Sequence, residues 1–556
     1  MDRRAFFLRH SSAPALQNPP YEVLPGVFVP ETDPVRWGEA PPRPDPEDAP
    51  AALHRGAATL GIAAGIEPYV PSEGAKWTRR RVQHLLRRTG FGTTPAAIDA
   101  FGDMSPGDAV DALVDGVLAL PDMPRPSWAD TPPPHWTAPQ AERDAYTQAN
   151  VGWYEEFGID VLDRMLGTGI ADPVASSITA FRERLALFWH NHFVTGLNIY
   201  FLAPWLYRYW DLLFRHSLGD FKAFAHDITL TPAMLVYLNG TDNRVGAPNE
   251  NYARELLELF TTGILGPDGQ PNYTQTDITE LARALTGWSV DYFGQTDTPL
   301  ESVFVPSWYD DGPKTLFGTP DSPGERYNVE RAVELIFEKR APQTAHFIAR
   351  KLYVEFVYHV PDESLVAELA TVLLTNDFAL EPTIRTLLKS AHFFDDAALG
   401  AHMKSPAETM LGLYREIGFE PDAEFHSAHA YTMQLAGQRL FDPPTVAGWP
   451  GGRAWLDTSR LAARWTHVEW LVYRQNAYRD LAAQFPDSQW DAAALASDLA
   501  DFLLGVPLDD AGKAELTDIL LNGIPAYEWD PTVPGAENRL RALVIHLARL
   551  PEFQLS

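Results

Sequence analysis

The chain has 556 residues, a formal net charge of −30 at pH 7 and no cysteine. Its negative field would repel a phosphate backbone, so a nucleic-acid partner is not expected. The absence of cysteine excludes disulfides, thiolate metal ligands and cysteine nucleophiles, so any metal would need histidine and carboxylate ligands. The one basic cluster is expected to pair with carboxylates rather than bind an anion: Arg79, Arg80, Arg81, Arg87 and Arg88.

Residues 1–75 predict an extended N-terminal arm, because Pro, Ala, Glu and Asp recur there without helical periodicity. Arg3-Arg4 followed by Phe6-Phe7-Leu8 is typical of a twin-arginine export motif. No apolar stretch follows at His10–Pro14, so a degenerate or partner-dependent export signal and a chance Arg-Arg pair are both open. The first interpretation favours a periplasmic or secreted location and the second a cytoplasmic one. No run of about 18 apolar residues occurs, so no membrane span is expected.

From Lys76 onward, apolar residues recur at helical spacing, which predicts one large all-α domain over residues 76–556, with any sub-boundary near 320–330. Thr94-Pro95 and Thr231-Pro232 are typical helix starts, with threonine as N-cap and proline at the first helical position. Residues 300–318 carry β-favouring side chains on both sides of the turn Tyr309–Pro313, which predicts a small hairpin or flap.

Two stretches, residues 188–193 and 249–260, place titratable side chains among apolar residues in a helical pattern. They contain the candidate catalytic residues His190, His192, Glu250, Arg254 and Glu255. Burying such groups is costly unless they pair, form hydrogen bonds or bind a metal. On a helix, His190 and His192 are about 200° apart, so both could bind one ion only if the last turn were distorted. For each histidine, a hydrogen-bonded core role and a role as ligand or general base are both open.

Glu255 shares a helix face with Tyr252 and Leu256, so it should point inward and need a cation, a metal or a shifted pKa. Arg283 and Arg184 are the alternatives to a metal as its partner. On the adjoining stripe, Arg254 can pair with Glu258 four residues later. Asn249 precedes the apolar run and is interpreted as the N-cap of this helix.

Residues 441–455 contain three prolines and three glycines, which predicts an irregular loop. Asp442, Trp449 and Trp455 are candidate substrate-binding residues, because exposed indole faces beside glycines can stack on a sugar. The alternative is that both tryptophans anchor the loop to the core. No P-loop, Gly-rich dinucleotide turn or Gly-x-Ser-x-Gly elbow occurs, so neither a nucleotide nor a flavin is expected.

Six motifs occur in order, at His84–Gly92, Phe188–Phe193, Gly246–Phe260, Leu281–Trp288, Lys314–Gly318 and Phe441–Gly452. Together they resemble the bacterial family called domain of unknown function 1800, over about residues 76–556. The resemblance implies a mostly uncharacterised protein of a kind that is often exported and often encoded beside a sulfatase-like family, domain of unknown function 1501. The family pattern often has a histidine where this chain has Tyr309, so the Asp-Asp-Gly turn is not counted among metal ligands.

Two functional hypotheses follow. The first is a metal-dependent enzyme acting on an extracytoplasmic glycan, in which His190, His192 and Glu255 bind a divalent metal ion of unknown identity. In that hypothesis Glu250 is the second carboxylate, and Arg254 and Arg283 also belong to the catalytic set. The second hypothesis is a non-catalytic partner or escort of a sulfatase-like protein, with the proline-rich arm and the acidic surface as its contact regions.

Overall fold

The computed structural model describes residues 58–293, 300–322, 324–418, 421, 423–474 and 478–556. The export-like motif and the predicted arm up to residue 57 lie outside the described residues. Residues 58–78 have almost no regular structure, and the Tyr69 N–H donates to the Lys389 carbonyl at 2.8 Å. All of the described residues belong to one compact unit.

The described residues are all-α, as predicted, with two small two-stranded sheets. The first helices are α2 (Arg79–Thr89), α3 (Pro95–Gly102), α4 (Pro106–Ala119), α5 (Gln140–Leu166), α6 (Pro173–His192), α7 (Leu197–Tyr200), α8 (Ala203–His216), α9 (Phe221–Thr229) and α10 (Pro232–Tyr237). The predicted starts at Thr94-Pro95 and Thr231-Pro232 are confirmed as those of α3 and α10.

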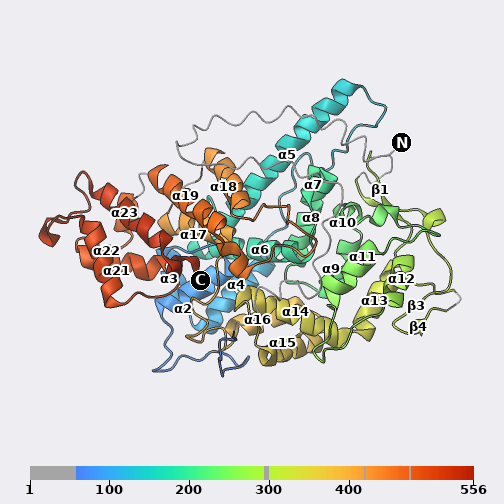
Figure 1. The fold of residues 1–556 in the computed structure, drawn as a ribbon, viewed down its shortest axis with the longest axis horizontal. Helices are drawn as coiled ribbons and strands as arrows, with labels where there is room; N and C mark the ends of the chain where they lie inside the picture. Colours follow the sequence, from blue (N-terminus) through green and yellow to red (C-terminus); the bar gives the residue numbers. More distant parts are fainter. Residues whose placement is uncertain (1–57, 294–299, 323, 419–420, 422, 475–477) are drawn as a thin grey trace. The chain divides into compact units, whose positions relative to one another are not determined.

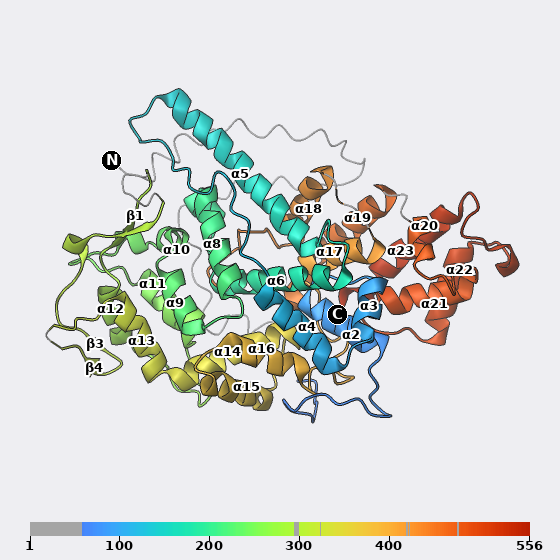
Figure 2. The ribbon, with the colours of Figure 1, turned by 180° about the vertical axis from the view of Figure 1, so that it is seen from behind.

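The middle of the chain combines helices with both sheets. Its elements are η3 (Gly240–Asp242), α11 (Glu250–Glu255), the π-helix η4 (Leu256–Thr261), α12 (Gln275–Ala284), β1 (Trp288–Val290), β2 (Ser302–Phe304), η5 (Pro306–Trp308), β3 (Thr315–Leu316), β4 (Thr319–Pro320), α13 (Val329–Lys339), α14 (Ala341–Phe356), α15 (Glu363–Thr375) and α16 (Leu380–Lys389). Helices α14, α15 and α16 pack side by side, as Figures 1 and 2 both show.

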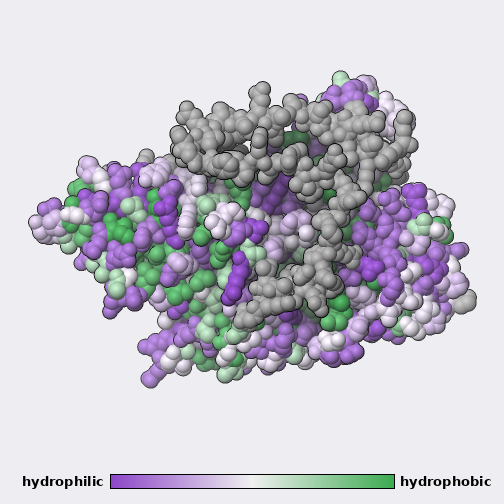
Figure 3. Space-filling view, viewed as in Figure 1, coloured by the Kyte–Doolittle hydropathy of each residue, from purple (hydrophilic) through white to green (hydrophobic). Residues whose placement is uncertain are grey.

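The C-terminal part of the chain is helical again. Its elements are α17 (Pro406–Ile417), α18 (Ala423–Leu435), η6 (Gly452–Leu456), α19 (Thr458–Arg474), α20 (Tyr478–Ala483), α21 (Ala492–Leu503), α22 (Asp510–Leu521), η7 (Ala526–Glu528), α23 (Ala536–Arg549) and η8 (Pro551–Gln554). On the face shown in Figure 3, hydrophobic residues lie scattered among hydrophilic ones over these helices. In the described part of the chain, no helix combines the length and apolarity needed to cross a bilayer.

Helix α6 packs against α2, α3, α4, α5 and α8 and is buried from Ala180 to His190. The Asp172 side chain caps its start, where Pro173 stands at the first helical position. Since nearly every face of α6 is covered, its charged groups must find partners inside the protein. Arg184 is 3% exposed and forms ion pairs with Glu355 at 2.8 Å and with Glu408 at 3.1 Å.

The basic cluster on α2 pairs with carboxylates, as predicted, for four of its five members. These ion pairs are Arg79–Asp99, Arg81–Asp396 (2.6 Å), Arg87–Glu416 (2.9 Å) and Arg88–Glu408 (3.9 Å). The fifth arginine, Arg80, donates to the Leu399 carbonyl at 3.3 Å.

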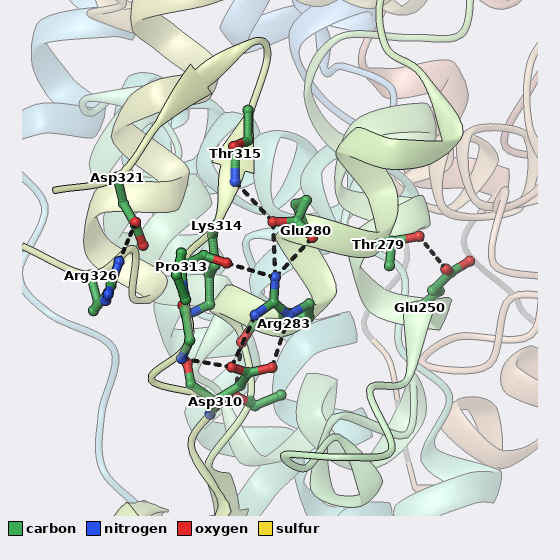
Figure 4. Close-up of polar contacts among 12 residues, drawn as sticks. Glu250, Thr279, Glu280, Arg283, Asp310, Pro313, Lys314, Thr315, Asp321 and Arg326 are labelled. Atoms are coloured by element: carbon green, nitrogen blue, oxygen red, sulfur yellow. Dashed lines mark hydrogen bonds and ion pairs between the residues drawn. The ribbon is translucent and has the colours of Figure 1, made fainter. Parts of the chain in front are cut away.

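β2 and β3 lie within the predicted segment 300–318, but β1 and β4 lie outside it, and the pairing differs from a single hairpin. β2 pairs with β1, and β3 pairs with β4, so the turn at Tyr309–Pro313 joins two sheets instead of closing one hairpin. The reason is visible in Figure 4: the Arg283 guanidinium donates two hydrogen bonds to Asp310, at 2.8 and 3.1 Å, and so fixes the turn against α12.

Several buried histidines make the fold sensitive to acid. Burial lowers the pKa of His190 and of His467 to about 3 in each case. Because the unfolded chain binds these protons near pH 6.5 and the folded chain does not, stability should fall as the pH drops below that value. For each histidine, the free energy of unfolding should fall by roughly 1.4 kcal/mol per pH unit.

Calorimetry between pH 7.5 and 5 tests this expectation as a falling Tm. His467→Gln should make the decline shallower. A Tm that stays constant or rises as the pH is lowered from 7.5 to 5 would contradict the burial of neutral histidines.

Candidate functional site

The C-terminal end of α6 meets the loop that precedes η6. The Asn191 side-chain oxygen accepts a hydrogen bond from the Trp449 N–H at 2.7 Å, and the Leu197 N–H donates to the Phe441 carbonyl at 3.0 Å. Gly448 has φ +85°, and a Cβ there would lie 2.2 Å from the Asn191 side-chain oxygen. Glycine is therefore required where the loop passes closest to α6.

His190 is completely buried and points toward this loop. The centroids of the His190 and Trp449 rings are 5.4 Å apart, and His190 Nδ1 is 2.9 Å from the Tyr209 hydroxyl oxygen. The Tyr209 hydroxyl donates to the Phe193 carbonyl at 2.6 Å, so its proton is already used. Neutral His190 therefore carries its proton on Nδ1, which donates to Tyr209, and presents Nε2 as an acceptor.

His192 points to a different part of the core. Its Nε2 donates to the Phe260 carbonyl at 3.0 Å, at the end of the second motif. That motif begins as predicted, with Asn249 as N-cap of α11, but continues as the π-helix η4. The Thr261 hydroxyl donates to the Leu256 carbonyl five residues earlier, at 2.6 Å, which fits the wider π-helical turn.

The structure does not join His190, His192 and Glu255 into a metal centre. Helix α6 is regular through His192, so the two imidazoles stay on different sides of it. Among the described residues, no three His, Asp or Glu side chains are grouped closely enough to bind one metal ion. His190, His192 and Glu255 therefore do not fit one shared metal ion.

Among the carboxyl groups near His190 and Trp449, Asp442 has the pKa that differs most from its ordinary value. Its side chain is 9% exposed, and the Arg439 guanidinium lies 3.0 Å from it. Burial raises the pKa of Asp442 to about 6, although Arg439 and the Asn198 backbone N–H both act in the opposite direction. This carboxyl can therefore both donate and accept a proton near neutral pH.

Two tyrosines lie near Asp442. Burial raises the pKa of Tyr200 and of Tyr237, and the nearby charge of Asp442 raises each further. A Cβ at Gly196 would lie 3.3 Å from an Asp442 carboxylate oxygen and 3.2 Å from the Tyr237 ring, so both side chains lie directly over this glycine. We call the group the Asp442 cluster: His190, Tyr200, Tyr209, Tyr237, Asp442 and Trp449.

Tyr237 connects the cluster to the second motif. The charge of Glu255, like that of Asp442, raises the pKa of Tyr237. Glu255 is 5% exposed and ends α11. The expected partners of Glu255 are engaged elsewhere, because Arg283 pairs with Asp310 and Glu280, and Arg184 pairs with the carboxylates described above. The ion pairs described for Arg283 and Arg184 are thus with carboxylates other than Glu255.

The other predicted catalytic residues lie in an ion-pair network between α11, α12 and the following loop. Arg254 pairs with Glu250 at 3.0 Å and, as predicted, with Glu258 at 3.6 Å. Glu250 also accepts from the Thr279 hydroxyl at 2.7 Å, a contact drawn in Figure 4 beside Arg283. Glu250, Arg254 and Arg283 therefore have structural partners that account for their charges, and they do not contact His190.

Trp449 and Trp455 are each only 5% exposed. Neither presents an exposed indole face, contrary to the expectation of a sugar-stacking platform, and both anchor the loop to the core. The indole Nε1 of Trp449 and Nε2 of His190 have no hydrogen-bond partner among the described residues. The cluster thus offers one N–H donor and one acceptor to a polar group.

Sequence reasoning identified His190, Asp442 and Trp449 but missed Tyr200, Tyr209 and Tyr237. The three tyrosines come from α7, α8 and α10 and have no shared spacing in the chain. One feature of the sequence could have indicated Tyr200. The small residues Thr195 and Gly196 follow the end of α6, where the chain turns and the next helix, which carries Tyr200, comes against the loop.

One comparison with known proteins gives a match. A family model described as "Protein of unknown function (DUF1800)" matches residues 84–555. Neither the curated proteins nor the solved structures include a significant match to the chain.

Proposed function

This chain belongs to the DUF1800 family, whose function is unknown, and we propose that it is an enzyme that cleaves a glycan by acid–base catalysis at the Asp442 cluster. The observation that carries the proposal is the environment of Asp442, which is nearly buried and has a pKa of about 6. Pairs of carboxyl groups with different pKa values are the usual apparatus of glycoside hydrolysis. Here Glu255, whose charge raises the pKa of Tyr237 as that of Asp442 does, is the second carboxyl.

In the proposed reaction, protonated Asp442 donates its proton to the oxygen of the leaving sugar as the glycosidic C–O bond breaks. Glu255 accepts a proton from the attacking water, whose oxygen forms the new bond to the anomeric carbon. One water is consumed, and each new chain end carries a hydroxyl. Tyr200 and Tyr237 keep their protons, because burial and the nearby carboxylates raise their pKa, so both can donate hydrogen bonds to the substrate.

Hydroxyl groups also suit the remaining polar atoms of the cluster. A sugar hydroxyl can donate to His190 Nε2 and accept from the Trp449 indole N–H, the two atoms without partners among the described residues. An apolar substrate would leave both atoms unsatisfied. This complementarity supports a glycan over a hydrocarbon or lipid chain.

Glu255→Gln tests the second carboxyl. The exchange keeps the volume of the side chain and removes its charge, so the protein should remain folded. Release of reducing ends from a panel of neutral and acidic polysaccharides should fall by about 10²–10⁴-fold. The matched control is Glu258→Gln, on the next turn of the same segment, which removes a partly buried partner of Arg254 and should leave the rate within about twofold, because Arg254 keeps its ion pair with Glu250.

Equal rates for Glu255→Gln and the wild type would eliminate Glu255 as a catalytic group. If Glu255→Gln does not fold, Tyr237→Phe provides the second variant, because it removes only the hydroxyl on which both carboxylates act and should also lower the rate. A wild-type protein that releases no reducing ends from any polysaccharide would contradict the enzyme and favour the non-catalytic partner of a sulfatase-like protein, which co-expression and pull-down can test.

A further inference from the structure

A small pocket lies between α2 and three segments that are distant from it in the chain. One wall is a stripe of α2 side chains at helical spacing, namely Arg80, Gln83, His84 and Arg87. Residues 399–400, 504–505 and Ser556 form the opposite wall. We call this space the Arg80 pocket. The space that it encloses admits a body of about the size of a water molecule.

Two glycines bring the segments of the opposite wall together. Gly400 has φ +76°, and a Cβ at this position would overlap the Gly505 carbonyl. A Cβ at Gly505 would in turn overlap the Leu555 carbonyl. Much of this wall is therefore backbone, and the polar side chains of α2 face it.

Two of the four α2 side chains are already bonded to the protein. Arg87 donates to Glu416 at 2.9 Å, to the Leu504 carbonyl at 3.1 Å and to the Phe502 carbonyl. Gln83 Nε2 also donates to the Phe502 carbonyl, at 3.3 Å. These bonds serve carbonyl groups at the C-terminal end of α21, so Arg80 and His84 are the groups left to a ligand.

Arg80 is a partly buried cation with unused hydrogen-bond donors. Of its five N–H groups, one makes a hydrogen bond to a described residue, to the Leu399 carbonyl at 3.3 Å. The carboxylates whose charges act on Arg80 are Asp396 and Asp501, but these pair with Arg81 at 2.6 Å and Lys513 at 2.9 Å. Both carboxylates are also largely exposed, at 71% and 48%.

His84 is the second group that lacks a partner. Its side chain is 4% exposed, and neither ring nitrogen makes a hydrogen bond of normal geometry to a described residue, although the Phe393 backbone acts on the ring. Burial, and then the charges of Arg88, Arg80 and Arg81, lower the pKa of His84 well below its ordinary value. The ring is therefore a neutral imidazole with one N–H, in surroundings that the arginines make electropositive. An anion suits both the unused donor and this positive potential.

We propose that the Arg80 pocket binds a monatomic anion such as chloride, which accepts hydrogen bonds from the Arg80 guanidinium and the His84 ring. A tetrahedral oxyanion such as sulfate is larger than the enclosed space. The bound anion links α2 to the end of α21 and to Ser556, and so helps to hold the C-terminal segment against α2. The site does not depend on the Asp442 cluster or its reaction.

Chloride-35 NMR on the full chain tests the site, because exchange of chloride with a protein broadens the signal of chloride in solution. The chain has a net charge of −30, so non-specific binding of anions should be weak. Wild-type protein should broaden the signal, and Arg80→Gln should lose this broadening. The matched control is Arg79→Gln, which removes the same charge from an arginine that is 61% exposed and pairs with Asp99, and it should retain the broadening.

Thermal unfolding provides the second measurement. An anion that binds the folded chain alone stabilises it, so the Tm should be higher in sodium chloride than in sodium gluconate of equal ionic strength. Arg80→Gln should remove this difference, and Arg79→Gln should keep it. A pocket that takes only water would give no broadening with the wild type. That result, equal broadening by Arg80→Gln and the wild type, or binding of sulfate in preference to chloride would overturn the proposal.

Discussion

Asp442→Asn is expected to reduce glycan cleavage by about 10²–10⁴-fold while the protein stays folded. Asparagine keeps the shape of the side chain but can neither donate nor accept the catalytic proton. The folded-state pKa of Asp442 is raised to about 6, so its ionisation at pH 7 destabilises the fold, an effect that develops as the pH rises from about 4 to 6. The asparagine variant should therefore have an equal or higher Tm at pH 7.

The control for this prediction is Asp457→Asn. Asp457 lies in the same part of the chain, is 49% exposed and caps α19 by accepting from the Arg460 N–H at 2.8 Å. Asparagine is also a good N-cap, so both activity and Tm should stay close to those of the wild type. Unchanged cleavage by Asp442→Asn, measured as reducing ends at pH 6, would contradict the acid–base role.

The largest loss of stability is expected for Arg184→Met. This arginine pairs with Glu355 and Glu408, and its removal takes the ion-pair partner of Glu355 away and leaves Glu408 with Arg88 at 3.9 Å. Arg184 has the largest effect among the cationic groups that hold the pKa of Glu408 below its ordinary value against the effect of burial. Breaking a buried ion pair from one side typically costs about 3–5 kcal/mol, which should appear as a lower midpoint in urea unfolding.

An exposed arginine provides the comparison. Arg331 pairs with Glu334 at 3.0 Å, but the two side chains are 38% and 64% exposed. Arg331→Met should cost at most about 1 kcal/mol, because solvent screens that pair. If the two substitutions cost the same, the buried network around Arg184 does not stabilise the fold as described.

The parts of the fold that could be predicted from sequence depend on local physics. Helix starts such as Thr94-Pro95 and Asn249 follow from backbone capping, and the pairing of Arg254 with Glu258 follows from helical spacing. Pairing between distant residues is different. Arg283 reaches Asp310 through a turn whose position depends on two separate sheets, and nothing local to Arg283 indicates it.

The candidate site shows the same division. His190 and His192 belong to one sequence motif. Because they lie on different sides of a regular, buried helix, they contact different groups, the Tyr209 hydroxyl and the Phe260 carbonyl. Asp442 was a candidate for substrate binding, yet its acid–base character depends on desolvation by segments far apart in the chain. That quantity cannot be read from residue order.

The most direct test of the account is an infrared titration of the Asp442 carboxyl. The difference between wild-type and Asp442→Asn spectra isolates the C=O stretch of one protonated carboxyl, and its intensity can be followed from pH 3 to 8 without any substrate. The account predicts that this band disappears with a midpoint near pH 6. A midpoint at about 4, the ordinary value for aspartate, would contradict it.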